Sequence, residues 1–208
     1  LMSSKDSQKY REIADRFSAQ GLAVLRFDFR GNGESEGSGD IISNRIMDLK
    51  AAIQFATGRG FKCIGLLGSS FGGATAIIVA SETAEIKCLV TWSTPCRLIE
   101  LSGSINRKDV EDRSRNQEPT HKAIETSEFM KDLAGHSVVE ASKKVSNIMV
   151  IHCKGDIVVP WSDAKIIYEN AKQPKRLKIF EKGDHQFIDP RIRKEALELS
   201  LGWCSKYL

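Results

Sequence analysis

Residues 65–80, GLLGSSFGGATAIIVA, constrain the fold more than any other part of the sequence. The segment begins as an apolar run with the character of a β-strand and bends within a cluster of glycines and serines. It then continues as an apolar run with the character of a helix. A strand that turns directly into a helix is half of a β-α-β unit, so the segment indicates an α/β fold.

The rest of the chain repeats this alternation of strands and helices. We expect strands at 22–29, 62–69, 86–93, 147–152 and 176–180. We expect helices around Tyr10–Phe17, at 40–57 and 71–81, after Ser162, and from Pro190 onward with Asp189 as the cap. Strands separated by helices predict a mostly parallel sheet with helices on both faces.

Residues 96–145 interrupt the alternation, because they contain helix-like pieces but no convincing strand. A loop of this length is implausible inside a compact domain unless it has structure of its own. We predict a small helical cap at 96–145, inserted into an α/β core formed by 1–95 and 146–208. Six apolar cap residues either wall a substrate pocket or, as we favour for most, face inward from short helices: Leu98, Ile99, Leu101, Phe129, Met130 and Leu133.

Composition argues against several classes of function. A chain of 208 residues with 41% hydrophobic and 28% charged residues is typical of a globular protein with one substantial core. The net charge of +4, from scattered residues of both signs, gives no case for nucleic acid or a membrane as a partner. The five cysteines are far apart and form no Cys-x-x-Cys pair, which favours a reduced cytoplasmic protein without structural zinc.

The bend at 68–72, GSSFG, matches Gly-x-Ser-x-Gly in the strand–turn–helix context that gives this pattern meaning. Such a bend strains the serine backbone and lifts the hydroxyl of Ser70 clear of the strand ends. We expect Gly68 and Gly72 where strand and helix approach too closely for side chains. We also expect the Phe71 amide, at the start of the helix, to stabilise an oxyanion. The alternative is a turn without chemistry.

A serine hydroxyl needs a base and an orienting carboxylate to act as a nucleophile. Two of the four histidines lie in the cap segment, and His152 lies in an apolar run, where we expect a buried structural role. His185 follows the last strand, and Asp156 follows the strand before it. Loops after the carboxyl ends of parallel strands converge on one edge of a sheet. We therefore predict Ser70, Asp156 and His185 as the catalytic residues.

Four segments resemble motifs of the α/β-hydrolase superfamily, and specifically of its small-cap esterases and serine-aminopeptidase-like hydrolases. They are LRFDFRGNGESEG (25–37), similar to an Asp-x-Arg-Gly-x-Gly-x-Ser loop, the nucleophile turn GLLGSSFGG (65–73), the acid turn IHCKGDIVVP (151–160) and the histidine loop GDHQF (183–187). The resemblance extends over nearly the whole chain apart from the cap. Gly31 and Gly33 suggest a dinucleotide loop, but Glu36 stands where a third glycine is needed. We interpret that loop as structural.

The sequence departs from these relatives in two places. Cys153 and Lys154 stand where relatives have glycine and an additional acidic residue, and we expect little consequence because Asp156 itself matches. The second departure is at the start of the chain. Relatives carry three strands and a His-Gly motif before the first helix, whereas LMSSKDSQKY resembles the sequence immediately after His-Gly.

We therefore expect an N-terminally truncated product, in which Leu1 carries the second oxyanion-hole amide. In the sheet order of relatives, a missing strand would lie between the strands at 22–29 and 62–69. These two strands would then pair directly, or a second copy would complete the sheet in a homodimer.

The resemblance implies a carboxylesterase-type serine hydrolase with a Ser-His-Asp triad and an acyl-enzyme intermediate. The implied substrates are small short- to medium-chain carboxylic esters, and the reaction needs no metal or organic cofactor. A thioesterase or aminopeptidase variant of the same triad is an alternative, the latter with an acidic pocket to which Glu36, Asp40 or acidic residues of the cap could contribute. A different alternative is a non-catalytic fragment of the fold that binds a small molecule or self-associates.

Overall fold

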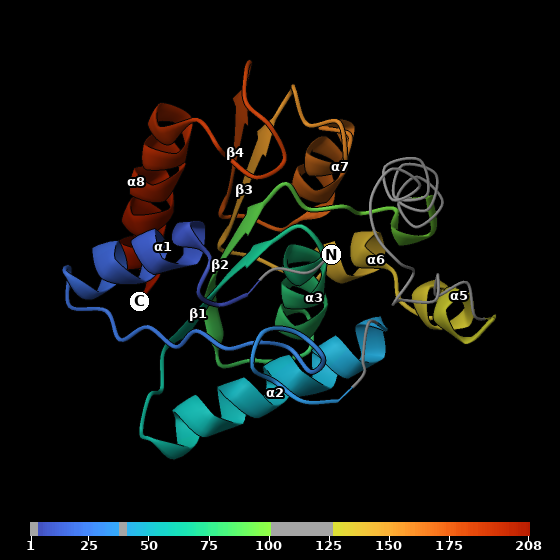
Figure 1. The fold of residues 1–208 in the computed structure, drawn as a ribbon, viewed down its shortest axis with the longest axis horizontal. Coiled ribbons are helices and arrows are strands. Elements are labelled where there is room, and N and C mark those ends of the chain that lie inside the picture. Colours follow the sequence, from blue (N-terminus) through green and yellow to red (C-terminus); the bar gives the residue numbers. More distant parts are fainter. Residues whose placement is uncertain (1–3, 38–40, 101–126) are drawn as a thin grey trace, which may run out of the picture.

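In the computed structural model, which describes residues 4–37, 41–100 and 127–208, four parallel strands form one sheet (Figure 1). The strands are β1 (Ile64–Ser69), β2 (Ile86–Trp92), β3 (Ile148–Cys153) and β4 (Lys175–Phe180). They lie in the order β1-β2-β3-β4, and each pairs in parallel with the next. All four carboxyl ends therefore lie at the same edge of the sheet, where the loops after the strands can meet.

Helices cover both faces of this sheet. They are α1 (Gln8–Ser18), α2 (Ile42–Gly58), α3 (Phe71–Ala80), α5 (Ser127–Ala134), α6 (Val138–Ser142), α7 (Ser162–Asn170) and α8 (Pro190–Tyr207). Figure 1 shows α1 and α8 together on one face, with α3 and α7 on the other and α2 packed against α3. The predicted parallel sheet with helices on both faces is confirmed. Among the described residues, no helix is both long enough and apolar enough to cross a membrane.

The side chains of the central strands alternate between the two helical layers, as strand geometry requires. In β3, Ile148 and Val150 pack into the cluster formed with α2, α3 and α7, whereas Met149 and Ile151 pack into the cluster formed with α1 and α8. Every residue of β3 is buried. A strand covered on both faces needs a continuous apolar run, which is why this segment was recognisable from its sequence.

The ends of two helices follow local sequence signals. α8 begins at Pro190, and the Asp189 carboxylate accepts a hydrogen bond from the Arg191 amide at 2.8 Å, which confirms the predicted cap. After α1 the chain turns at Gly21, whose φ of +82° is a conformation that glycine adopts without strain.

The predicted strand at 22–29 was wrong. These residues have no regular secondary structure and pair with no strand among the described residues, and β1 pairs only with β2 there. The segments at 22–29 and 62–69 were expected either to pair directly or to be completed by a second copy. Direct pairing of these segments is not seen. The reason is that β-structure needs a hydrogen-bonded neighbour, whereas propensity and apolar character are properties of the segment alone. Val24 and Leu25 remain 36% and 49% exposed, which is unusual for residues of an apolar strand-like run.

The described parts of the predicted cap are residues 96–100 and 127–145, which include α5 and α6, while Leu101 lies outside the described residues. Three of its apolar side chains are buried in the same hydrophobic cluster as α2 and α3, namely Leu98, Phe129 and Leu133. They are inward-facing core residues. Ile99 and Met130 are 48% and 36% exposed. The division of the chain into core and cap stays a prediction.

Candidate active site

Ser70 lies at the point where the chain passes from β1 into α3. Its backbone has a φ of 55° and a ψ of −129°, a conformation that non-glycine residues seldom adopt. The Ser70 amide donates a hydrogen bond to the Trp92 carbonyl oxygen at the end of β2, at 2.8 Å, which anchors the turn to the neighbouring strand. The strained backbone expected at this serine is confirmed.

Close packing around the turn leaves no room for a side chain at Gly68 or at Gly73. Of these two positions, only Gly68 was predicted. A Cβ atom at Gly68 would lie 2.5 Å from the Gly72 carbonyl oxygen, so no side chain fits there. The expectation for Gly72 was wrong, because a Cβ atom there would meet no described atom within 4 Å. The helical position that needs glycine is Gly73, where a Cβ atom would lie 2.0 Å from Thr94 Oγ1.

The side chains of Ser70 and Asp156 each lie within hydrogen-bond distance of His185, as predicted for three residues that act together. His185 Nε2 is 3.0 Å from Ser70 Oγ, and His185 Nδ1 is 2.8 Å from Asp156 Oδ2. Because an ionised carboxylate only accepts hydrogen bonds, Nδ1 carries the ring proton and Nε2 accepts from the serine hydroxyl. Asp156 and His185 are each only 8% exposed. This arrangement can activate a hydroxyl group for nucleophilic attack.

Asp156 is held in the turn after β3 by contacts to both carboxylate oxygens. Oδ1 accepts from the amides of Val158 and Val159, both at 2.9 Å, while Oδ2 faces His185 and also His152 Nε2 at 3.2 Å. Burial alone would raise the pKa of Asp156, but the hydrogen bonds of the two imidazoles and the Val159 amide hold that pKa well below its usual value. The carboxyl group therefore stays ionised beside His185.

Two glycines allow the acid turn and the histidine loop to touch. A Cβ atom at Gly155 would lie 2.4 Å from the Gly183 carbonyl oxygen, and one at Gly183 would lie 2.8 Å from Cys153 Sγ. Gly183 also has a φ of +107°. The buried Cys153 thus fills the space beneath the histidine loop, and the departure from the family motif leaves the acid turn in place.

The histidine loop is anchored by Phe187, two residues after His185. The Phe187 side chain is fully buried, with ring centroids 4.8 Å from Trp92 and 6.3 Å from Phe180. Phe187 has a φ of 58° and is buried, whereas its apolar neighbour Ile188 is 69% exposed. Sequence analysis did not identify this anchor, although a large aromatic residue in a loop of glycine and polar residues was a usable signal.

Within the described residues, the Phe71 amide is the candidate hydrogen-bond donor to the oxyanion. Phe71 is the first residue of α3, so its N–H has no acceptor within the helix and lies at the positive end of the helix dipole beside Ser70. Leu1, the other predicted donor, lies outside the described residues. Its role remains a prediction.

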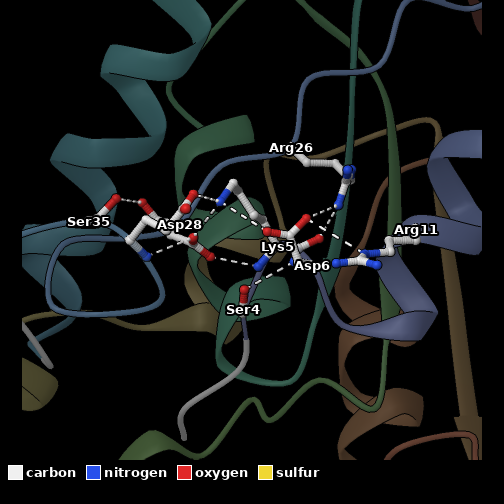
Figure 2. A network of polar contacts seen from close by, with 8 residues as sticks. Ser4, Lys5, Asp6, Arg11, Arg26, Asp28 and Ser35 are labelled. Atoms are coloured by element: carbon white, nitrogen blue, oxygen red, sulfur yellow. Dashed lines mark hydrogen bonds and ion pairs between the residues drawn. The ribbon is translucent and has the colours of Figure 1, made fainter.

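A polar network ties the N-terminal segment to the loop after residue 28, as Figure 2 shows. The Asp28 side chain accepts hydrogen bonds from the Lys5 amide at 2.6 Å and from Lys5 Nζ at 3.2 Å. Lys5 Nζ also pairs with Asp6 at 3.1 Å and contacts Glu34. Burial alone would raise the pKa of Asp28, but the amides of Lys5 and Glu34 hold it below its usual value.

The glycines of this loop make room for the Asp28 carboxylate. A Cβ atom at Gly33 would lie 2.1 Å from Asp28 Oδ2, and the φ of Gly33 is +54°. Ser35 Oγ closes the loop by donating to the Asp28 carbonyl oxygen at 2.8 Å. The structural interpretation of the Gly31–Gly33 pattern is therefore confirmed for Gly33.

Lys9 of α1 also contacts the turn around Ser70, which the sequence did not indicate. Lys9 Nζ donates to Ser69 Oγ at 2.9 Å. Burial lowers the pKa of Lys9 to about 8, an effect that the charge of Asp184 partly opposes. The contact joins α1 to the nucleophile turn.

A second Ser-His-Asp group has a different role. Ser43 Oγ lies 2.9 Å from His136 Nε2, but the Asp132 carboxylate accepts from the amides of Ile42 and Ser43 and so caps α2 from α5. His121 lies outside the described residues. Within the described ranges, no group of three or more His, Cys, Asp or Glu side chains is arranged to hold a metal ion.

A known protein family matches the part of the chain that contains the turn around Ser70. The family model described as serine aminopeptidase, S33, matches residues 4–108, just over half of the chain. The chain belongs to this family. The matched part includes α1, the Asp28 loop and the turn around Ser70. Together with the fold, membership of the S33 family makes the chain an α/β hydrolase.

The sequence relatives do not narrow the activity. The uncharacterized protein YfhR of Escherichia coli O157:H7 is 27% identical over 169 residues, which are 78% of this chain and 52% of that protein. The chain thus spans about half the length of the curated relatives it matches.

Solved structures of similar fold include esterases. The esterase domain of a Rhodothermus marinus protein aligns with a TM-score of 0.72 at 23% identity, covering 98% of this chain and 82% of the other. The Pyrococcus furiosus esterase Pf2001 aligns with a TM-score of 0.75 at 23% identity, covering 99% and 79%. At this level of identity the likeness establishes the fold.

Proposed function

We propose that this hydrolase is a serine carboxylesterase that cleaves short- to medium-chain esters through an acyl-enzyme intermediate. The observation that carries the proposal is the 3.0 Å contact of Ser70 Oγ with His185 Nε2, with Asp156 behind the imidazole at 2.8 Å. The esterases among the structural neighbours support the choice of esters as the acyl substrates.

In the proposed first step, Ser70 Oγ attacks the ester carbonyl carbon while His185 Nε2 takes the hydroxyl proton. Asp156 holds the imidazole in the required tautomer and stabilises the imidazolium. That proton then passes to the leaving oxygen, the C–O bond breaks, and an alcohol departs from acylated Ser70. In the second step, His185 removes a proton from water, which attacks the acyl group and releases the carboxylic acid.

The tetrahedral oxyanion would be held by the Phe71 amide and by a second amide near Leu1. Losing one such donor typically lowers turnover by roughly 10²–10³-fold. The Lys5–Asp28 contacts support this assignment, because they fix the backbone just after the proposed second donor.

Amide and thioester hydrolysis use the same catalytic groups, and we rank them below ester hydrolysis. An aminopeptidase would also need an acidic group to bind the substrate amine. Glu36 lines a groove against α2, and Asp40 lies outside the described residues. A panel of p-nitrophenyl esters of increasing acyl length, an acyl thioester and an aminoacyl anilide separates the three activities. We expect the fastest hydrolysis for the short and medium esters.

The first test is the intact mass after exposure to a fluorophosphonate. We expect one adduct on the protein and none on Ser70→Ala, because the reagent reports an activated serine. A folded protein that acquires no adduct would contradict the proposal and favour the alternative of a non-catalytic member of the fold. Thermal unfolding of both proteins serves as the control for folding.

A further inference from the structure

A second histidine contacts the carboxylate of the candidate triad. His152 of β3 is fully buried, and its Nε2 lies 3.0 Å from the Val159 carbonyl oxygen and 3.2 Å from Asp156 Oδ2. Both neighbours are acceptors, so Nε2 carries a proton. His152 Nδ1 has no hydrogen-bond partner among the described residues, and a proton there would be buried without an acceptor. The ring therefore has the Nε2–H form.

These contacts close a ring of interactions around the acid turn. The His152 N–H donates to the Val159 carbonyl oxygen, and the Val159 amide donates to Asp156 Oδ1 at 2.9 Å. Asp156 Oδ2 then faces the His152 N–H. One side chain thus contacts both the backbone that holds the carboxylate and the carboxylate itself.

We propose that His152 is a positioning residue, which acts on His185 through Asp156. Oδ2 of Asp156 lies 2.8 Å from His185 Nδ1 and 3.2 Å from His152 Nε2, so a nitrogen of each imidazole is close to the same carboxylate oxygen. The His152 N–H draws negative charge from the oxygen that stabilises the imidazolium form of His185. It thereby weakens the interaction of Oδ2 with the His185 imidazolium, while it fixes the position of the carboxylate.

Other titratable groups around this cluster do not replace His152. Burial, followed by the charges of Asp156 and Asp184, raises the pKa of Cys153 to about 12, so its thiol is neutral near pH 7. Asp184 is in the histidine loop, where its charge also acts on Lys9 of α1. Ser70 faces His185 from the turn before α3.

The test compares one substitution that removes the N–H donor of His152 with another that keeps an N–H donor at this position. His152→Phe keeps a ring of similar size and removes the N–H, whereas His152→Gln keeps an amide N–H with similar reach. We expect the acidic limb of the pH profile for fluorophosphonate labelling to move upward by about half to one pH unit in His152→Phe. His152→Gln should return towards the profile of the unsubstituted protein. Thr91→Val, which alters a buried hydroxyl of β2, is the control and should leave the profile unchanged.

A spectroscopic readout separates this inference from the proposed function, on which the labelling profile rests. The His185 Nδ1–H proton, assigned by its loss in His185→Gln, should resonate further downfield in His152→Phe because Oδ2 is then free of the competing N–H. This measurement applies even if the protein acquires no adduct, the result that would contradict the proposed function alone.

Equal profiles and equal resonances in His152→Phe, His152→Gln and the unsubstituted protein would overturn the inference and leave His152 as a packing residue. If His152→Phe does not fold, His152→Asn takes its place, because the shorter amide does not reach Oδ2. That variant should show the same upward shift.

Discussion

The space around individual α-carbons determines which side chains fit in the turn at Ser70. Gly72 and Gly73 are adjacent in α3 and chemically identical, yet their surroundings differ. A Cβ atom at Gly73 would lie 2.0 Å from Thr94 Oγ1, whereas one at Gly72 would meet no described atom within 4 Å. The two positions therefore form a matched pair for testing the geometry of the turn.

We predict that Gly73→Ala lowers the free energy of unfolding by about 1–3 kcal/mol, because the new methyl group overlaps the Thr94 side chain. Gly72→Ala should change it little or raise it by up to about 1 kcal/mol, since alanine favours the helix. Urea unfolding of both variants measures the difference. Thr94→Ala in the Gly73→Ala background should recover part of the loss. Equal effects at Gly72 and Gly73 would contradict the packing described here.

A second residue-scale prediction concerns Lys9, whose pKa burial lowers to about 8 from 10.5 in the unfolded chain. Between these values the unfolded state binds more protons than the folded state, so stability rises with pH across that window. At pH 7 the buried charge of Lys9 opposes folding. Lys9→Met removes this charge and also the hydrogen bond to Ser69, and the net effect should be a free energy of unfolding higher by about 1–2 kcal/mol. The gain should shrink as the pH approaches 10. A gain independent of pH in urea titrations would argue against a buried charged amine.

Single residues also show where inference from the sequence ends. Ser70, Asp156 and His185 could be predicted because each follows a strand, and parallel strands bring those loops to one edge. Gly73 could not, because its constraint comes from Thr94, which lies in the loop after β2. His152 was correctly expected to be buried, but its neighbour Asp156 depends on how the acid turn folds back, which no local pattern encodes.

At the scale of elements, the histidine loop depends on a side chain that takes no part in the proposed chemistry. Phe187 packs between Trp92 and Phe180 and holds His185 two residues away. We predict that Phe187→Leu lowers stability by about 1–2 kcal/mol and slows fluorophosphonate labelling at least tenfold. Phe17→Leu, in the same hydrophobic cluster but on α1, is the control. It should lower stability similarly and leave labelling unchanged, whereas equal labelling in both variants would show that Phe187 only fills the core.

A helix or strand could be predicted from the sequence when the residues that determine it lie within the same segment. α8 has a cap and an initial proline in its own sequence, and β3 is apolar throughout because helices cover both faces. The segment at 22–29 has a similar apolar character, yet it is not a strand, because pairing depends on a neighbour outside the segment.

At the scale of the whole molecule, the edge of the sheet at β1 determines how the chain can associate with a second copy. β1 lies at the end of the strand order, and within the described ranges only β2 pairs with it. The backbone N–H and C=O groups of an unpaired edge favour association with another chain. Apolar side chains are exposed as well, including Leu25 and Phe55, which line a groove of about 730 Å³ against α2.

We therefore predict that the 208-residue chain by itself forms a homodimer through this region, with a solution mass of twice 23.1 kDa. The exposed side chains of Leu25 and Phe55 add an apolar contact that association would remove from water, so the double variant Leu25→Lys, Phe55→Glu should shift the equilibrium to the monomer. Ile188→Glu is the control, since Ile188 is 69% exposed but lies in the loop before α8. Light scattering over a range of concentrations measures the mass of each protein. A monomer at every concentration would contradict the prediction, and a dimer unaffected by the double variant would place the interface elsewhere.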